Sequence, residues 1–353
     1  MGFEGFPLIV GWELTLACNL RCRHCASAAG LPRQDELSVA ECLAICDQFP
    51  SLLVQEVDFT GGEPLLKPGW EKIAARLREL GIPVRMVSNG LGITPDVVLR
   101  MKEAGLASVG VSLDGLGATH DRVRALDGMF GTVIAALERL AGAGLAPTVI
   151  TAVNALSLPE LPRLLDLLSG IGVRAWQLQP IFPWGRSALA TELHLTADHY
   201  LQLGAFVAEW EAKARDKGVE LRPADSCGYF TELSRGPEWQ GCSAGIAAVG
   251  IMSDGNVKGC LSMPDELTEG NLRANDLWDI WFREDAFSCT RAFAAGRLGP
   301  NCAGCEYGEQ CRGGCSSMSY TTTGQFHNDP YCFHGIRVRR AGGVDTRFAR
   351  AGS

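Results

Sequence analysis

The sequence has no hydrophobic run long enough to cross a membrane and no excess of positive charge. No stretch of about 18 apolar residues occurs, which excludes a transmembrane helix. The N-terminus lacks the basic segment and apolar core of a secretory signal, and this indicates a cytoplasmic protein. With 32 Lys and Arg against 40 Asp and Glu, the net charge is −8. This balance argues against general binding to nucleic acid or to acidic lipid, so the sequence predicts neither nucleic acid nor a membrane as a partner.

Internal repeats and low-complexity tracts are also absent. The 353 residues are 46% hydrophobic and 20% charged, which is ordinary for a globular protein. This length predicts about two domains. The only locally basic stretch lies at the C-terminal end, in residues 336–353, and we expect a solvated tail there.

Cysteine is missing from residues 47–226, although the chain contains 14 cysteines. Five precede this gap and nine follow it. In a cytoplasmic protein thiols stay reduced, so clustered cysteines indicate metal binding or catalysis rather than disulfides. The distribution predicts two metal regions separated by a scaffold without cysteine.

Short apolar runs alternate with amphipathic segments over the N-terminal two thirds of the chain, a pattern typical of parallel α/β folds. A capping box at Ser38 and the pair Thr94-Pro95 mark helix starts, and glycines such as Gly105 and Gly170 mark helix ends. We therefore expect an α/β fold, a partial (β/α)6 TIM-type barrel with ligands at the carboxyl ends of its strands. The predicted strands are residues 8–16, 54–60, 84–88, 108–113, 147–153 and 173–179.

The C-terminal third has a different character. A helix predicted at residues 196–217 precedes a segment rich in proline and glycine, and a short cysteine-dense region with a hairpin at residues 247–260 follows. Such a small core needs additional links, which metal clusters can supply. The predicted organisation is a barrel at 1–218, a linker at 219–240, a cysteine-rich domain at 241–335 and a basic tail at 336–353.

A C-x3-C-x2-C run, formed by Cys18, Cys22 and Cys25, directly follows the first predicted strand. This spacing suits a loop wrapped around an iron–sulfur cluster, and three thiolates on a four-iron cluster leave one iron open to substrate or cofactor. The alternative is a zinc site, which needs a fourth ligand nearby, such as His24. The residues alone leave both kinds of metal centre open.

The run resembles the signature of the radical SAM superfamily, in which an aromatic residue or histidine precedes the last cysteine. Further motifs follow successive strands in the order of that family: Thr60-Gly61-Gly62-Glu63-Pro64, Ser88-Asn89-Gly90 and Ser112-Leu113-Asp114-Gly115. The resemblance covers about residues 8–190 and implies a site for S-adenosylmethionine (SAM). The implied cofactor-binding residues are His24, Gly61, Gly62, Glu63, Pro64, Ser88, Asn89, Ser112, Asp114 and Arg124.

The resemblance also implies individual roles. The motif after the second strand would receive the amino group of SAM, and Ser112 and Arg124 would hold its carboxylate, because a guanidinium binds a carboxylate through two donors. The Gly185-Arg186 pair resembles a turn near the cofactor. The family's glycine motif on the fifth strand is absent, so the sequence assigns no adenine contact.

Seven C-terminal cysteines follow a pattern similar to the SPASM domain, a small cysteine-rich iron–sulfur domain that follows the barrel in many radical SAM enzymes. The resemblance implies two auxiliary [4Fe–4S] clusters, with Cys227 as a candidate fourth ligand of the second one. A pair of zinc ribbons is the alternative that the spacing allows. The implied ligands are Cys302, Cys305, Cys311 and Cys332 for one cluster and Cys242, Cys260 and Cys315 for the other, while Cys42, Cys46 and Cys289 are expected in the core.

The resemblance thus implies a radical SAM enzyme with three [4Fe–4S] clusters, which cleaves SAM reductively to a 5′-deoxyadenosyl radical that abstracts hydrogen from a substrate. Relatives with SPASM domains commonly modify peptides, and the segment from Trp12 to Cys18 looks most like the mycofactocin maturase group. A maturase of ribosomally made peptides is therefore favoured. The alternatives are a sulfatase-type maturase of protein side chains, an enzyme acting on a small molecule, and a non-catalytic electron-transfer protein.

The implied partners are a peptide substrate and an electron donor such as flavodoxin or ferredoxin. Only residues 1–7 precede the first predicted strand, so we expect no fused leader-binding domain. A separate leader-binding protein presents the peptide, or the peptide binds directly. Asp225 and Tyr229 stand beside Cys227, yet the sequence assigns no catalytic acid or base.

Overall fold

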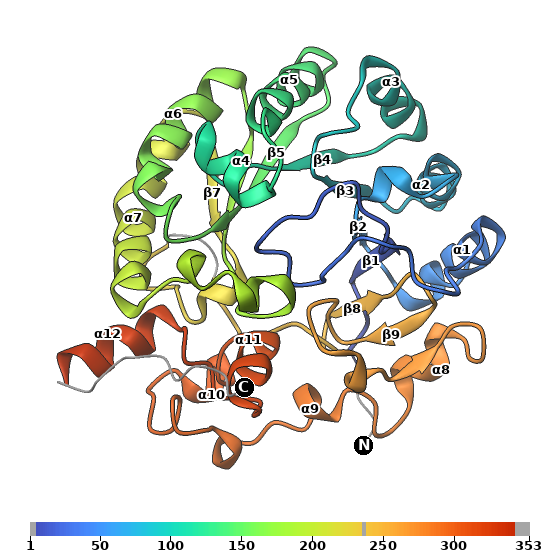
Figure 1. Cartoon of the computed structure of the whole chain (residues 1–353). Coiled ribbons are helices and arrows are strands. Elements are labelled where there is room, and N and C mark those ends of the chain that lie inside the picture. Colours follow the sequence, from blue (N-terminus) through green and yellow to red (C-terminus); the bar gives the residue numbers. More distant parts are fainter. Residues whose placement is uncertain (1–4, 235–237, 343–353) are drawn as a thin grey trace.

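The computed structural model describes residues 5–234 and 238–342 of the chain. Its centre is a ten-stranded sheet in the order β10-β9-β8-β1-β2-β3-β4-β5-β6-β7. Each neighbouring pair from β1 to β7 is parallel, and helices surround the curved sheet as a partial barrel (Figure 1). The predicted fold class is confirmed.

All six predicted strands are present: β1 (Ile9–Thr15), β2 (Glu56–Gly61), β3 (Val84–Ser88), β4 (Ser108–Ser112), β5 (Pro147–Val153) and β6 (Ala175–Pro180). A seventh parallel strand, β7 (Glu220–Pro223), lies inside the segment predicted as a linker, residues 219–240. This short strand ends in proline, and among its residues only Leu221 is buried, so it lacks the apolar run that marks the other strands.

Helices follow the strands of the barrel: α1 (Val39–Cys46), α2 (Trp70–Glu79), α3 (Pro95–Ala104), α4 (Ala118–Arg124), α5 (Met129–Gly142), α6 (Leu161–Ile171) and α7 (Ala197–Asp216). The helix starts at Ser38 and Thr94 are confirmed, because both side chains accept a hydrogen bond from the first turn. One predicted end is wrong. Helix α6 continues past Gly170 and ends at Gly172, whose φ of 88° favours glycine.

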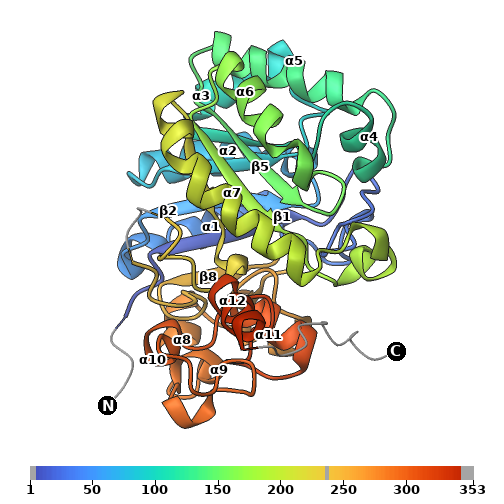
Figure 2. The same ribbon diagram turned by 90° about the vertical axis from the view of Figure 1, so that its left-hand side faces the viewer.

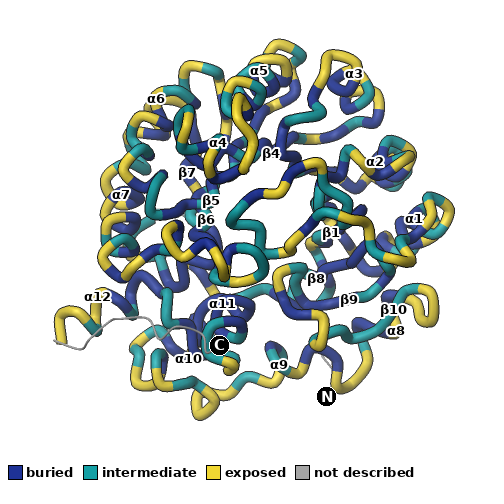
Figure 3. The backbone as a smooth tube through the Cα atoms, in the orientation of Figure 1, coloured by how far each residue is buried: buried dark blue, intermediate teal, exposed yellow. Residues whose placement is uncertain are grey.

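Alternate strand residues face the helices and form the core. Trp12 of β1 and Phe59 of β2 are in register, and their rings lie edge to face with centroids 6.2 Å apart. Cys42 and Cys46 of α1 are buried, as predicted. Figure 3 shows buried strands at the centre and exposed outer surfaces on the helices. The other strand residues, such as Thr60, therefore point into the barrel.

The cysteine-rich region shares the sheet of the barrel. Strand β8 (Ala248–Ile251) pairs in parallel with β1, and it forms the predicted hairpin with β9 (Asn256–Lys258). Strand β10 (Gly270–Asn271) follows β9. The remaining helices lie below the barrel (Figure 2): α8 (Leu277–Phe282), α9 (Ser288–Arg291), α10 (Gly308–Cys311), α11 (Ser316–Thr323) and α12 (Phe333–Ala341).

The first part of the predicted solvated tail is helical, and residues 337, 338 and 340–342 are exposed. Helix α12 covers residues that the prediction left in the tail, and Ile336 is buried. The ring of Phe333 packs edge to face on Tyr200 of α7, with centroids 5.9 Å apart. Arg337 donates to Glu232 at 2.6 Å, so its charge is paired within the fold. The rest of the predicted tail, residues 343–353, lies outside the described residues.

No helix in the described part of the chain is long and apolar enough to span a membrane.

Candidate active site

A cavity of about 270 Å³ lies at the carboxyl ends of the barrel strands. Its walls come from the loop after β1, from the ends of β2 to β6, and from Ser262 of the cysteine-rich region. Parallel barrels bind their ligands at this end of the strands. Eight of the predicted cofactor-binding residues line the cavity: His24, Gly61, Gly62, Ser88, Asn89, Ser112, Asp114 and Arg124.

The loop after β1 brings Cys18, Cys22 and Cys25 to the cavity wall. The Cys22 thiol lies 3.8 Å from Nη1 of Arg124, and the Leu20 amide donates to the Cys18 thiol at 3.5 Å. Burial raises the pKa of Cys18 and of Cys22, and the charge of Cys25 adds to the rise at both. Cys22 is buried and Cys18 and Cys25 are partly buried. Thiols gathered at one cavity wall fit a bound cationic metal centre, because metal coordination stabilises thiolates.

Glycines let the strand ends pack directly on this cysteine loop. A Cβ on Gly62 would lie 2.1 Å from the carbonyl oxygen of Ala17, and a Cβ on Gly185 would lie 2.1 Å from that of Ala26. Arg186 then holds the loop, since its Nε donates to the Cys22 carbonyl at 2.9 Å and its Nη1 to the Ala29 carbonyl at 2.8 Å. The Gly185-Arg186 turn therefore fixes the loop from the β6 side of the cavity.

Asp114 organises the polar side of the cavity. Its Oδ2 lies 2.7 Å from Nε of Arg124 and 3.5 Å from Nε2 of His24, and its Oδ1 accepts from the Ala152 amide at 2.9 Å. Burial alone would raise the pKa of Asp114, but Arg124 and His24 lower it below its ordinary value. Burial lowers the pKa of His24 and of His120 to about 4. At neutral pH the charged pair is therefore Asp114 with Arg124.

Glu63 and Pro64 do not line the cavity. The buried Glu63 carboxylate accepts from the Ser88 hydroxyl at 2.9 Å and from the amides of Asn89 at 2.8 Å and Leu65 at 3.2 Å. Burial raises its pKa to about 7. Glu63 thus holds the ends of β2 and β3 together, and Thr60, Gly61 and Gly62 are the residues of this motif that line the cavity.

The seven other predicted cysteine ligands fall into two groups by the effect of their charges on one another. In each group the pKa of buried thiols is raised by burial and further by neighbouring thiols of the same group. Backbone amides donate to these sulfurs, as in the contacts of Gly314 with Cys311 at 3.2 Å and of Tyr229 with Cys332 at 3.3 Å. Such amide contacts suit iron–sulfur clusters, whose sulfurs accept hydrogen bonds. The three-cysteine group is Cys242, Cys260 and Cys315, and the four-cysteine group is Cys302, Cys305, Cys311 and Cys332.

Cys227 lies on the side of the four-cysteine group, whereas the resemblance made it a candidate fourth ligand of the other cluster. The neighbouring Gly228 packs so closely on Cys332 that a Cβ would lie 2.6 Å from its Cα. The Cys227 thiol is fully buried and lies 3.9 Å from the Leu178 carbonyl oxygen. The charge of Asp225 raises the pKa of Cys227, and also that of Cys242 and Cys260, in each case after the larger effect of burial.

Sequence reasoning missed Asp329, a buried residue near both cysteine groups. Its Oδ2 accepts from the Cys315 amide at 3.1 Å and its Oδ1 from the Tyr331 amide at 2.8 Å. Burial raises its pKa to about 7, and its charge raises the pKa of Cys302 and Cys311. The only signal for it in the sequence is its position three residues before Cys332.

Comparisons with known proteins agree with this geometry. The radical SAM superfamily model matches residues 12–168, and the SPASM iron–sulfur cluster-binding domain model matches residues 242–306. An AdoMet-dependent heme synthase of Methanosarcina barkeri is 29% identical over 350 residues, covering 93% of this chain and 97% of the relative. The mycofactocin maturase MftC of Mycobacterium ulcerans is 32% identical over 340 residues, covering 93% of this chain and 88% of the relative.

The crystal structure of Streptococcus suis SuiB bound to precursor peptide SuiA has a TM-score of 0.75 and 18% identity, covering 94% of this chain and 76% of SuiB. At this identity the likeness concerns the fold alone. The fold and the cysteine-lined cavity define an iron–sulfur enzyme with a barrel. The chain belongs to the radical SAM superfamily and carries a SPASM domain, and its cofactors are [4Fe–4S] clusters and SAM.

Proposed function

We propose that this enzyme is a maturase of ribosomally made peptides, which abstracts a hydrogen atom from a peptide bound beside SAM. The observation that carries the proposal is that the barrel and the cysteine-rich region both contribute to the wall of the cavity. Ser262 lines the cavity only two residues after Cys260, a member of the three-cysteine group. A peptide side chain held at SAM would therefore also lie near an auxiliary cluster. Relatives named mycofactocin maturase support this proposal.

In this proposal Cys18, Cys22 and Cys25 hold the cluster that binds SAM. Cluster and SAM together supply the 5′-deoxyadenosyl radical that removes the hydrogen atom. Arg124 would bind the carboxylate of SAM mainly through Nη2, because Asp114 engages its Nε and the Cys22 thiol lies 3.8 Å from its Nη1. Ser112 and the glycines after β2 complete the polar contacts. Ile181 and Phe182, both buried, keep water away from the reacting atoms.

The two C-terminal cysteine groups hold the auxiliary clusters in this proposal. Cys227 is left out of the ligand set, because its segment packs on Cys332 rather than on the three-cysteine group. Cys242, Cys260 and Cys315 alone would then hold the second auxiliary cluster, and this group would supply an electron acceptor or an anchor for the substrate. Asp225 acts electrostatically on two thiols of this group, so its carboxylate would be close to such a substrate.

The proposed partners follow from this chemistry. An electron donor such as flavodoxin or ferredoxin reduces the cluster that binds SAM, and a separate leader-binding protein presents the peptide unless it binds directly. The proposed location is the cytoplasm, where thiols stay reduced.

A second candidate is an enzyme that acts on a small molecule, as the heme synthases do. The observation that favours it is the full-length similarity to AdoMet-dependent heme synthases, which reaches 97% of the relative's length. In this case the same cavity would accept a heme precursor in place of a peptide side chain.

An anaerobic assay separates the candidates. The reconstituted enzyme is incubated with SAM, dithionite and either short precursor peptides encoded beside its gene or a heme precursor. We expect 5′-deoxyadenosine and a mass change of the peptide, both lost when Cys18, Cys22 and Cys25 are replaced by alanine. Conversion of the heme precursor alone would favour the second candidate. No 5′-deoxyadenosine in well-loaded protein would contradict both.

A further inference from the structure

The loop between β9 and β10 serves two sites at once. Cys260 on this loop belongs to the three-cysteine group, and Ser262 lines the SAM cavity. The placement of residues 259–265 relative to the barrel therefore sets the separation between the auxiliary group and the cavity.

Lys258 holds this loop from within the cysteine-rich region. Only 2% of its surface is exposed, and its Nζ donates to the Met263 carbonyl at 2.6 Å and to Oδ1 of Asp265 at 2.9 Å. A buried ammonium requires such partners, because an unpaired buried charge is strongly unfavourable. In addition, the Ser317 hydroxyl donates to the Ser262 carbonyl at 2.5 Å.

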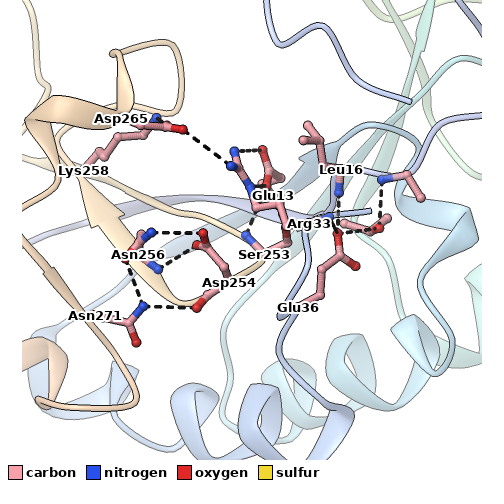
Figure 4. A network of polar contacts seen from close by, with 12 residues as sticks. Glu13, Leu16, Arg33, Glu36, Ser253, Asp254, Asn256, Lys258, Asp265 and Asn271 are labelled. Atoms are coloured by element: carbon pink, nitrogen blue, oxygen red, sulfur yellow. Dashed lines mark hydrogen bonds and ion pairs between the residues drawn. The ribbon is translucent and has the colours of Figure 1, made fainter. Parts of the chain in front are cut away.

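Arg33 contacts the same loop from the side of the barrel (Figure 4). Its Nη1 lies 3.5 Å from Oδ2 of Asp265. Its Nε and Nη2 lie 2.7 and 3.3 Å from the two carboxylate oxygens of Glu13, a residue of β1 that is 4% exposed. Glu13 also accepts from the Ser253 hydroxyl in the β8–β9 turn at 2.8 Å. One guanidinium therefore links β1 with the Cys260 loop.

The backbone at Arg33 is fixed to the start of the cysteine loop. Oε1 of Glu36 accepts from the Arg33 amide at 3.1 Å, from the Leu16 amide at 2.8 Å and from the Thr15 hydroxyl at 3.0 Å. Leu16 lies two residues before Cys18. Arg33 is therefore anchored where the loop with Cys18, Cys22 and Cys25 leaves the sheet.

We propose that Arg33 and Asp265 form a positioning pair that holds the loop carrying Cys260 and Ser262 against the SAM-binding cysteine loop. The pair keeps the substrate within reach of both the SAM cavity and the auxiliary cluster. This inference rests on the proposed function for the ligand roles of the cysteines, and it does not depend on the identity of the substrate.

Hydrogen–deuterium exchange of the purified full chain tests the pair. We expect Arg33→Ala and Asp265→Asn to raise amide exchange in residues 259–265 by at least about threefold, because a held loop opens less often than a free one. The Asp265 side chain is 69% exposed, so Asp265→Asn should fold. Arg33→Lys should restore part of the protection, since it keeps the charge.

Arg273→Ala is the matched control. Arg273 also links the two regions, with contacts to Glu41 at 2.6 Å, the Asp35 carbonyl at 3.0 Å and the Asp254 carbonyl at 3.2 Å. These contacts lie outside residues 259–265. We expect its removal to leave the exchange of that loop unchanged. Equal exchange of the loop in wild type, Arg33→Ala and Asp265→Asn would overturn the proposal.

A second readout uses the loaded enzyme. In Arg33→Ala we expect a changed electron paramagnetic resonance signal of the auxiliary clusters, with SAM cleavage retained and at least about threefold less product per 5′-deoxyadenosine, because the substrate is misplaced. If both the resonance signal of the auxiliary clusters and the amount of product per 5′-deoxyadenosine are unchanged in Arg33→Ala, the positioning role is contradicted. If the wild type converts no peptide, the proposed function fails, whereas the exchange and resonance results still decide the role of the pair.

Discussion

Replacing Asp114 with asparagine tests the polar centre of the cavity proposed to bind SAM. The carboxylate is fully buried and lies 2.7 Å from Nε of Arg124, which is itself only 7% exposed. Asparagine keeps the shape and can still accept from the Ala152 amide, but it leaves the guanidinium without a counter-ion. Removing one partner of a buried ion pair destabilises a protein by about 3–5 kcal/mol.

For Asp114→Asn we expect a loss of stability at the lower end of this range. Arg124 also lies 3.8 Å from the Cys22 thiol, and it lines a cavity that water can enter, so part of its charge stays solvated. We therefore expect a loss of about 3 kcal/mol, which corresponds to a fall in Tm of about 5 °C. SAM affinity should fall at least about tenfold, because the guanidinium is no longer held toward the carboxylate of SAM.

The assay is anaerobic thermal unfolding of the loaded protein at fixed concentration, together with equilibrium binding of SAM. Asp96→Asn is the matched control, because Asp96 pairs with Arg100 at 3.3 Å on the surface and its side chain is 77% exposed. Such an exposed pair contributes less than about 1 kcal/mol. If Asp114→Asn matches this control in both Tm and SAM affinity, the assignment of Asp114 as the residue that holds Arg124 is refuted.

Three further predictions concern other parts of the chain. Burial raises the pKa of Asp58 on β2 to about 6. Its ionisation therefore opposes folding, and this carboxyl alone should cost the wild type up to about 3 kcal/mol of stability between pH 4 and pH 7. Urea unfolding should accordingly show a weaker pH dependence in Asp58→Asn. Gly62→Ala should lower the iron content measured by colorimetry, since the new Cβ meets the Ala17 carbonyl, while Gly142→Ala on α5 has open space and should keep it. Asp329→Ala should remove at least one auxiliary cluster from the resonance spectrum, because the Cys315 and Tyr331 amides lose their acceptor.

The part of the site that lies at strand ends could be predicted from the sequence. Motifs that follow successive parallel strands meet at one edge of the sheet, so Cys18, Gly61, Ser88 and Ser112 line one cavity. The sequence does not predict in which direction a side chain at the end of a strand points. Gly61 is the last residue of β2, and Glu63 comes two residues later. The Glu63 carboxylate nevertheless accepts hydrogen bonds from the Ser88 hydroxyl and the Asn89 amide and does not line the cavity.

The pattern that resembles the SPASM domain predicts both cysteine groups, whereas spacing alone indicates a group only where the cysteines lie close in sequence. Cys302, Cys305 and Cys311 lie close in sequence and form one group. The position of Cys227 depends instead on how its segment packs, and Tyr229 meets Cys332 across 103 residues of sequence. No local pattern encodes such a contact.

The link between the two cysteine regions depends on a strand pairing that the sequence does not reveal. Glu13, Arg33 and Asp265 each look like ordinary charged residues, and they meet because β8 pairs in parallel with β1 and brings Ser253 to Glu13. Without β8, the β1 edge would be unpaired and Glu13 would lose two of its donors, both from Ser253. The cysteine-rich region therefore stabilises the barrel as well as carrying its own cysteine groups, and the SAM cavity and the three-cysteine group are held by one continuous sheet.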